Sequence, residues 1–167
     1  MIVDSFRYLP RSFRPLYEGR GPYRGEEAPV WAPFVKRLAD SRIALLTSAG
    51  LYVRGSQEPF DLDAERARPE WGDPSWRAIP ADASADLGVA HLHINDEDLL
   101  ADPEIVLPRG LLANLAEEGV IGSAASEHLA VMGYQERNLR DWHSTTAPAI
   151  ASFLQAEGAD GVVLAPA

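Results

Sequence analysis

The sequence predicts an α/β fold in which a mainly parallel sheet is flanked by helices, in a Rossmann-like three-layer arrangement. Short, continuous apolar runs at residues 43–47 and 161–164 are typical of strands buried on both faces, which is the habit of parallel sheets. Amphipathic helical patterns lie between the apolar runs. Because strands that alternate with helices favour right-handed crossovers, we expect most strands to pair in parallel.

The chain is expected to begin with a long irregular arm over residues 1–28, where prolines and glycines stand among aromatic and arginine side chains without a regular period. Residues 29–167 are expected to form a single α/β domain. Within it, apolar side chains that recur at three and four residues predict a helix over residues 29–40, with Pro29 at its start.

The remaining elements follow from pattern and from turn residues. A small-residue turn and a possible short strand follow the first strand, and a long irregular loop is expected over residues 54–85. Such a loop is usually functional or disordered, and its aromatic side chains make disorder the weaker option. Alternation predicts a strand over 87–94. Further along we expect a helix between Pro108 and Gly119, a strand over 128–132, a helix over 139–157 kinked or divided at Pro148, and the last strand over 161–164.

Composition excludes several classes of protein. The chain of 167 residues has a formal net charge of −10, which argues against nucleic-acid binding because that affinity comes largely from Lys and Arg. No stretch reaches the roughly 20 apolar residues of a membrane span, and no secretory signal is evident, so we expect a cytoplasmic location. The chain has no cysteine, which removes disulfides, thiolate metal sites and thiol nucleophiles together.

Three histidines and a glutamate are the candidate catalytic residues. His91 and His93 lie two apart on a predicted strand, so their side chains should leave from one face. His128 begins another apolar segment beside Glu127. Three imidazoles with a carboxylate would suit iron, zinc or copper with an open position. The alternatives are ordinary hydrogen bonds at a strand end, or histidines that act as acid, base or carboxylate-binding groups.

A second candidate feature is the turn after the first strand. Backbone N–H groups around Thr47, Ser48 and Gly50 could hold an anionic part of a substrate, although a plain strand-to-loop turn is the alternative. Neither a dinucleotide fingerprint nor a phosphate loop is present. Ser126, His128 and Asp141 include the residue types of a hydrolase triad, but no nucleophile-elbow pattern surrounds any serine.

Taken together, several segments resemble the selenoprotein B family of glycine, sarcosine, betaine and D-proline reductases, including its cysteine-bearing homologues. The matching segments are ALLTSAGLYVRGSQEPFD (44–61), GDPSWRAIP (72–80), HLHINDEDLLADPEIVLP (91–108), LLANLAEEGVIGSAASEHLAVMGY (111–134) and ADGVVLAP (159–166). The resemblance covers the chain beyond residue 29, and the order and spacing of the segments make it fairly specific.

The resemblance implies an α/β protein that takes part in reductive cleavage of a carbon–nitrogen bond in a small amino acid or amine. Tyr134, at the end of one matching segment, joins the turn residues as an expected substrate-binding residue. In the family, the redox selenocysteine or cysteine comes shortly after the strand that matches residues 161–164. This chain has no such residue. Either a companion polypeptide supplies it, or the sequence continues into a tail beyond residue 167, or this lineage uses another chemistry. We expect a companion subunit in a hetero-oligomer, which would also cover the last apolar strand.

Two other functions stay open at this point. The chain could be a metal-dependent enzyme of the same fold, in which His91, His93 and His128 bind a redox metal. It could also be a binding or scaffolding subunit without chemistry of its own. Metal analysis would separate the first of these from the rest.

Overall fold

The computed structural model describes residues 32–68, 71–82, 84–133, 135 and 139–167. Residues Phe34–Ala167 form one compact unit. The expected arm over residues 1–28 and its boundary with the domain lie outside the described residues and stay predictions.

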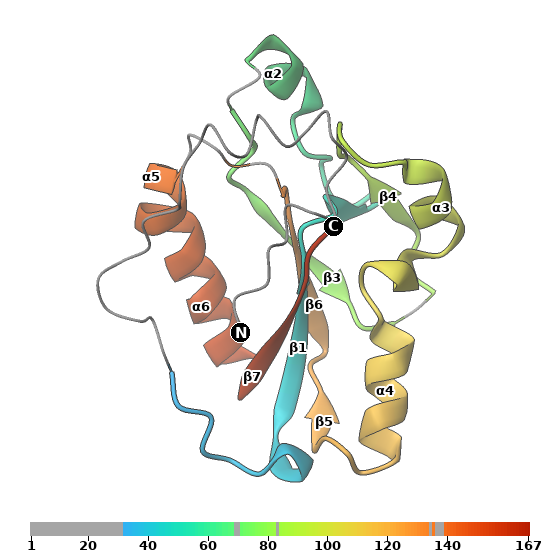
Figure 1. Ribbon diagram of the computed structural model, residues 1–167, viewed down its shortest axis with the longest axis vertical. Coiled ribbons are helices and arrows are strands. Elements are labelled where there is room, and N and C mark those ends of the chain that lie inside the picture. The colour runs from blue at the N-terminus through green and yellow to red at the C-terminus, as the bar shows by residue number, and fades with distance from the viewer. Residues whose placement is uncertain (1–31, 69–70, 83, 134, 136–138) are drawn as a thin grey trace, which may run out of the picture. The chain divides into compact units, whose positions relative to one another are not determined.

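The main sheet is built around β1 (Arg42–Thr47), one of the predicted buried strands. Along one edge, β1 pairs in parallel with β5 (Ser123–Ala124) and then with β6 (Glu127–Val131). Along the other edge it pairs in parallel with β7 (Gly161–Ala165), which continues from Ile43↔Gly161 to Thr47↔Ala165. The sheet is completed by β3 (Trp76–Pro80), which pairs antiparallel with β6. The sheet is therefore mixed but mostly parallel, as Figure 1 shows.

A small second sheet holds β2 (Leu51–Val53) and β4 (Leu87–Val89), which pair antiparallel. The strand predicted over 87–94 is therefore too long, because it ends at Val89 and the following residues form a bend. The turn into β2 uses Gly50 at φ +67°, a conformation that favours glycine. A Cβ there would also lie 2.2 Å from the carbonyl oxygen of Ala90.

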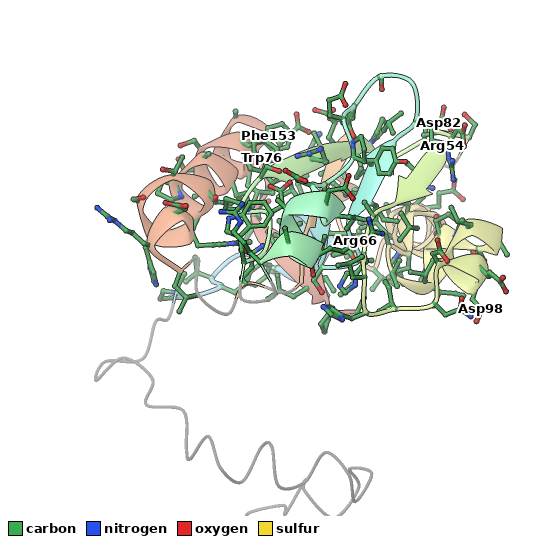
Figure 2. All side chains as sticks on the ribbon, turned by 90° about the horizontal axis from the view of Figure 1, so that it is seen from above. Arg54, Arg66, Trp76, Asp82, Asp98 and Phe153 are labelled. Carbon is green, nitrogen blue, oxygen red and sulfur yellow. The ribbon has the colours of Figure 1, made fainter. Side chains whose placement is uncertain are left out.

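Helices lie on both faces of the main sheet (Figure 1). On one face, α4 (Arg109–Glu117) buries Leu112 in a cluster with Leu45 and Ile79. On the other, α6 (Ala147–Ala156) buries Ile150 against Leu129 and Val131. Where α6 meets the sheet, the rings of Trp76 and Phe153 pack edge to face with centroids 5.1 Å apart (Figure 2).

The helix predicted over 139–157 is present in three parts: α5 (Leu139–Asp141), a π-helical turn η4 (Trp142–Thr146) and α6. Pro148 stands in the first turn of α6, where its missing N–H is tolerated, so the predicted division at this proline is confirmed.

The helix predicted over 29–40 is wrong in its described part. Residues 32–37 are irregular, and only a 3₁₀ turn, η2 (Leu38–Asp40), forms. Pro33 disfavours helix at the residue before it and donates no hydrogen bond, which explains the failure of an otherwise periodic pattern.

Short helices occupy the long loop that the sequence predicted to be irregular and a segment for which no element was predicted. They are α2 (Leu62–Ala67) in the long loop, and α3 (Asp96–Ala101) with the 3₁₀ turn η3 (Pro103–Ile105) after β4. No helix within the described residues is long and apolar enough to cross a membrane.

Candidate functional site

The exits of three parallel strands meet at the carboxyl edge of the main sheet. Ser48 follows β1, and its hydroxyl oxygen accepts a hydrogen bond from the backbone N–H of Ala167, which follows β7, at 2.9 Å. Gly133, just beyond β6, lies against the same serine, because a Cβ built there would be 3.1 Å from the Ser48 carbonyl oxygen. This is the edge at which open α/β sheets usually build their ligand sites.

His91 reaches this edge from the bend after β4. Its Nε2 would lie 3.3 Å from a Cβ at position 133, so the absence of a side chain on Gly133 leaves room for the ring. Its Nδ1 accepts a hydrogen bond from the backbone N–H of His93 at 3.1 Å. The neutral ring therefore carries its proton on Nε2, the nitrogen beside Gly133. Burial, assisted by the neighbouring His93, lowers the pKa of His91.

His93 lies next to His91 and connects it to a buried carboxyl group. The two rings are 5.9 Å apart at 82°. The Nε2 of His93 lies 3.3 Å from Oε1 of Glu65, whose side chain is 2% exposed while that of His93 is 58% exposed. Burial is the largest influence on Glu65 and raises the pKa of its carboxyl group.

Glu65 is a residue that sequence reasoning missed. It lies on α2, inside the segment interpreted as a long loop. The structure places it because Asp61 caps α2, accepting a hydrogen bond from the Ala64 N–H at 2.8 Å. Phe60, just before this cap, is buried against Ala90, the residue that precedes His91. The unusual length of the loop and its aromatic residues were the available signals, but neither identifies which acid becomes buried.

His128 lies elsewhere and is fully buried. Its Nδ1 accepts a hydrogen bond from the Leu45 N–H at 3.3 Å, between the neighbouring strands β6 and β1. Burial and the nearby Arg109 lower its pKa to about 4, against a smaller opposing effect of Glu157. A neutral imidazole bonded to the backbone inside the sheet contributes to packing and is poorly placed for proton transfer with a substrate.

The expected set of His91, His93 and His128 with Glu127 is not brought together. His128 lies five residues before Gly133, or about 16 Å along an extended chain. Strand alternation places Glu127 on the opposite face of the sheet from His128, the α6 side. Among the described residues no three His, Asp or Glu side chains form a group that could hold a metal ion.

The backbone N–H groups of the turn after β1 already have partners and are therefore not available to bind an anion. The N–H of Ser48 faces the carbonyl of Ala165 at 3.4 Å, and the N–H of Gly50 donates to Val131 at 3.0 Å. The N–H of Ala49 donates to the hydroxyl oxygen of the buried Thr47 at 3.2 Å. Since these N–H groups already have partners, Thr47 and Gly50 serve the fold, and the expected backbone cradle is not available. Tyr134, the remaining expected substrate-binding residue, lies outside the described residues.

A cavity of about 450 Å³ adjoins this edge. Ile94, directly after His93, and Ala167, which donates to Ser48, both line it. Its other walls are mostly aliphatic side chains of the α3–η3 segment, with the carboxylates of Asp98 and Asp102. Its chemistry suits a small molecule with an apolar body and a positively charged group.

Comparison with known proteins bears on what this edge does. Residues 25–167 match the family described as glycine/sarcosine/betaine reductase selenoprotein B. The chain is also 34% identical over 137 residues to the D-proline reductase subunit gamma of Acetoanaerobium sticklandii. This alignment covers 81% of the chain and 52% of that protein, so the chain spans about half the length of the curated relative it matches.

No solved structure matches the chain significantly. The match of the family extends over most of the sequence, and the identity to the relative lies above the level at which fold alone is shared. The chain belongs to the glycine/sarcosine/betaine reductase selenoprotein B family.

Proposed function

We propose that this chain is a component of a reductase that cleaves a carbon–nitrogen bond in a small amino acid or amine. We further propose that the edge around Ser48, His91 and His93 is its part of the active site. The observation that carries the proposal is the meeting of His91 with the exits of β1, β6 and β7. The family and the name of the relative supply the class of reaction.

Reductive cleavage of a carbon–nitrogen bond adds two electrons and two protons, so that one hydrogen ends on carbon and one on nitrogen. The chain has no cysteine, and we assign the electrons to a thiol or selenol pair of a companion polypeptide, which is oxidised. The resemblance places the family's redox residue shortly after the strand that corresponds to β7. The exit of β7 lies at Ser48, beside His91, so protons from the histidines and electrons from the companion would meet at one place.

The adjoining cavity is the proposed position of the substrate. Its volume of about 450 Å³ is within the range of small-molecule sites. Asp98 and Asp102 would attract the ammonium or substituted amine of an amino acid. Ile94, which directly follows His93 in the chain, lines the cavity, and we assign the transfer of a proton to the leaving amine to His91 and His93.

We place the companion polypeptide on the outer edge of β7. Among the described residues β7 pairs with β1 alone, although its apolar side chains Val163 and Leu164 are 50% and 69% exposed. Strands of parallel sheets are normally covered on both faces. The part of the relative that this chain does not match, about half its length, is the proposed source of a further strand and of the cover.

The experiment compares His93→Gln with wild-type protein after assembly with the companion polypeptide, using a dithiol as the electron donor. The glutamine amide can still donate to Glu65, which keeps the buried carboxylate from being stranded, but it cannot transfer a proton at neutral pH. We expect turnover of the amino-acid substrate to fall about 10²-fold or more, the usual contribution of general acid–base catalysis.

His143→Gln is the matched control, because this histidine is exposed on η4 and lies on another element. It should keep wild-type turnover. Wild-type turnover in the His93→Gln assembly would remove His93 from the mechanism. Stoichiometric iron, zinc or copper that is lost in His93→Gln would instead favour a metal-dependent enzyme over the proposed thiol chemistry.

A further inference from the structure

The carboxyl group of Glu65 is buried, and few polar groups contact it. Its side chain is 2% exposed, and apart from the contact with His93 neither carboxyl oxygen has a hydrogen-bond partner among the described residues. A carboxylate in such a place costs stability, because water no longer solvates it. The fold therefore gains little from this side chain as a structural element, and its position calls for a different explanation.

The geometry of the contact supplies one. Nε2 of His93 lies 3.3 Å from Oε1 of Glu65, and the His93 side chain is 58% exposed. A buried carboxylate that accepts from one ring nitrogen fixes the orientation and tautomer of a histidine. His93 in turn favours the charged form of the carboxyl group and so lowers the pKa of Glu65, against the larger effect of burial.

We propose that Glu65 is a positioning residue for His93, and that the two side chains act as one proton-holding pair beside the carboxyl edge of the sheet. The role of this proton in catalysis rests on the proposed function. The contact between the two side chains depends on the position of α2. Asp61 caps this helix and Phe60 anchors it, so that Glu65 reaches His93 in the bend after β4.

Other charged groups act on the pair from the surrounding elements. Arg66, the next residue of α2, lowers the pKa of the Glu65 carboxyl group, whereas Asp73, before β3, raises it. Both effects are smaller than those of burial and of His93. His91 is a titratable neighbour of the imidazole, with the two ring centroids 5.9 Å apart.

Carbon-13 NMR of the full chain, labelled at the glutamate carboxyl carbons, tests the pair directly. Glu65 should titrate above its ordinary range in the wild-type chain, because burial raises its pKa. In His93→Gln the midpoint should move further upward, since a protonated imidazole can no longer favour the charged carboxylate. His143→Gln should leave the midpoint unchanged. An unchanged midpoint in His93→Gln would overturn the proposal.

Stability and turnover of Glu65→Gln provide the second arm. The remaining His93 is largely exposed, so this change strands no buried charge, and urea unfolding at pH 7 should show equal or greater stability than wild type. Turnover of the assembled protein should fall about 10²-fold with KM little changed. A less stable protein with normal turnover would mean that Glu65 is structural, which contradicts the proposal.

The two arms also separate this proposal from the proposed function. The titration needs neither substrate nor companion, so coupling of Glu65 and His93 in an assembly that reduces no amino acid would overturn the reductase assignment while supporting the pair. Normal reduction by Glu65→Gln would overturn the pair's role and leave the reductase assignment in place.

Discussion

At the residue scale, the four histidines of the chain differ in what surrounds their ring nitrogens. His143 is exposed on η4, and His128 is enclosed between two strands with its Nδ1 bonded to the backbone. His91 and His93 lie together at the edge where the parallel strands end. The environment, and not the residue type, therefore selects which imidazoles are available for chemistry.

The buried His128 should make the fold sensitive to mild acid. Its pKa is lowered to about 4 from an ordinary value of 6.5, so between these values the unfolded chain binds more protons than the folded chain. The free energy of unfolding should therefore fall as the pH drops from about 6.5 to about 4, by at most about 3 kcal/mol. Urea unfolding at several pH values measures this loss.

His128→Asn is the informative variant for this prediction. Its amide oxygen can accept from the Leu45 N–H in place of Nδ1, but the side chain does not titrate. The variant should be less stable at pH 7, because the smaller side chain leaves a cavity, yet it should lose less stability on acidification than wild type. His143→Asn should keep the wild-type dependence on pH. A His128→Asn curve parallel to that of wild type would contradict the assignment.

At the element scale, the short helix α2 decides whether the site is complete. It has six residues, too few to be stable alone, so it depends on its cap and on packing. The Asp61 carboxylate accepts from the Ala64 N–H, and the backbone N–H of Asp61 itself donates to Asp73 at 2.9 Å. Phe60 supplies the buried anchor.

Asp61→Ala should loosen α2 and separate Glu65 from His93. Loss of an N-cap costs about 1 kcal/mol, and here the cost should be local to the helix. We expect faster amide hydrogen exchange in α2 and a smaller effect of His93→Gln on the titration of Glu65. Asp63→Ala is the control, because Asp63 is exposed in the same helix and forms its ion pair with Arg66 on the surface. Equal exchange rates in the two variants would contradict the capping role.

At the scale of the whole molecule, the sheet is asymmetric. On the β3 side it ends with a strand of antiparallel direction, and on the other side it ends with β7, which carries exposed apolar side chains. An apolar edge strand is a template for pairing with another chain.

If the proposed companion polypeptide pairs with β7, Leu164→Lys should weaken its binding by at least about tenfold, because a charge would be buried at the interface. The free energy of unfolding of the chain alone should stay within about 0.5 kcal/mol of wild type, since the side chain is exposed. Isothermal titration calorimetry measures the first quantity and urea unfolding the second. Leu111→Lys, at an exposed position on α4, should bind normally. Equal affinities of the two variants would place the interface elsewhere.

Much of the architecture could be predicted because it depends on local sequence patterns, such as apolar runs and the positions of prolines. The apolar runs became β1 and β7, although only β1 is buried as predicted and β7 has exposed apolar side chains. The region after Pro108 became α4, and Pro148 divided the last helical segment as expected. The predictions failed where a local pattern competed with something nonlocal or steric. Pro33 prevented the predicted helix before β1.

The strand β3 was not predicted, because it lies in a segment rich in proline and charged residues. Its pairing with β6, and not its intrinsic propensity, makes it a strand. The candidate site shows the same division. The pairing of His91 with His93 could be predicted from their spacing, although a bend and not a strand holds them together.

The sequence by itself determined the alternation of helices and strands, the absence of a thiol, and the two histidines that lie together, because each is a property of composition or of near neighbours. Only the tertiary structure decided that His128 is a buried structural residue and that Glu65 faces His93. Burial and contact between distant segments depend on how whole elements pack, and a short-range pattern carries no information about which side chain the packing will enclose.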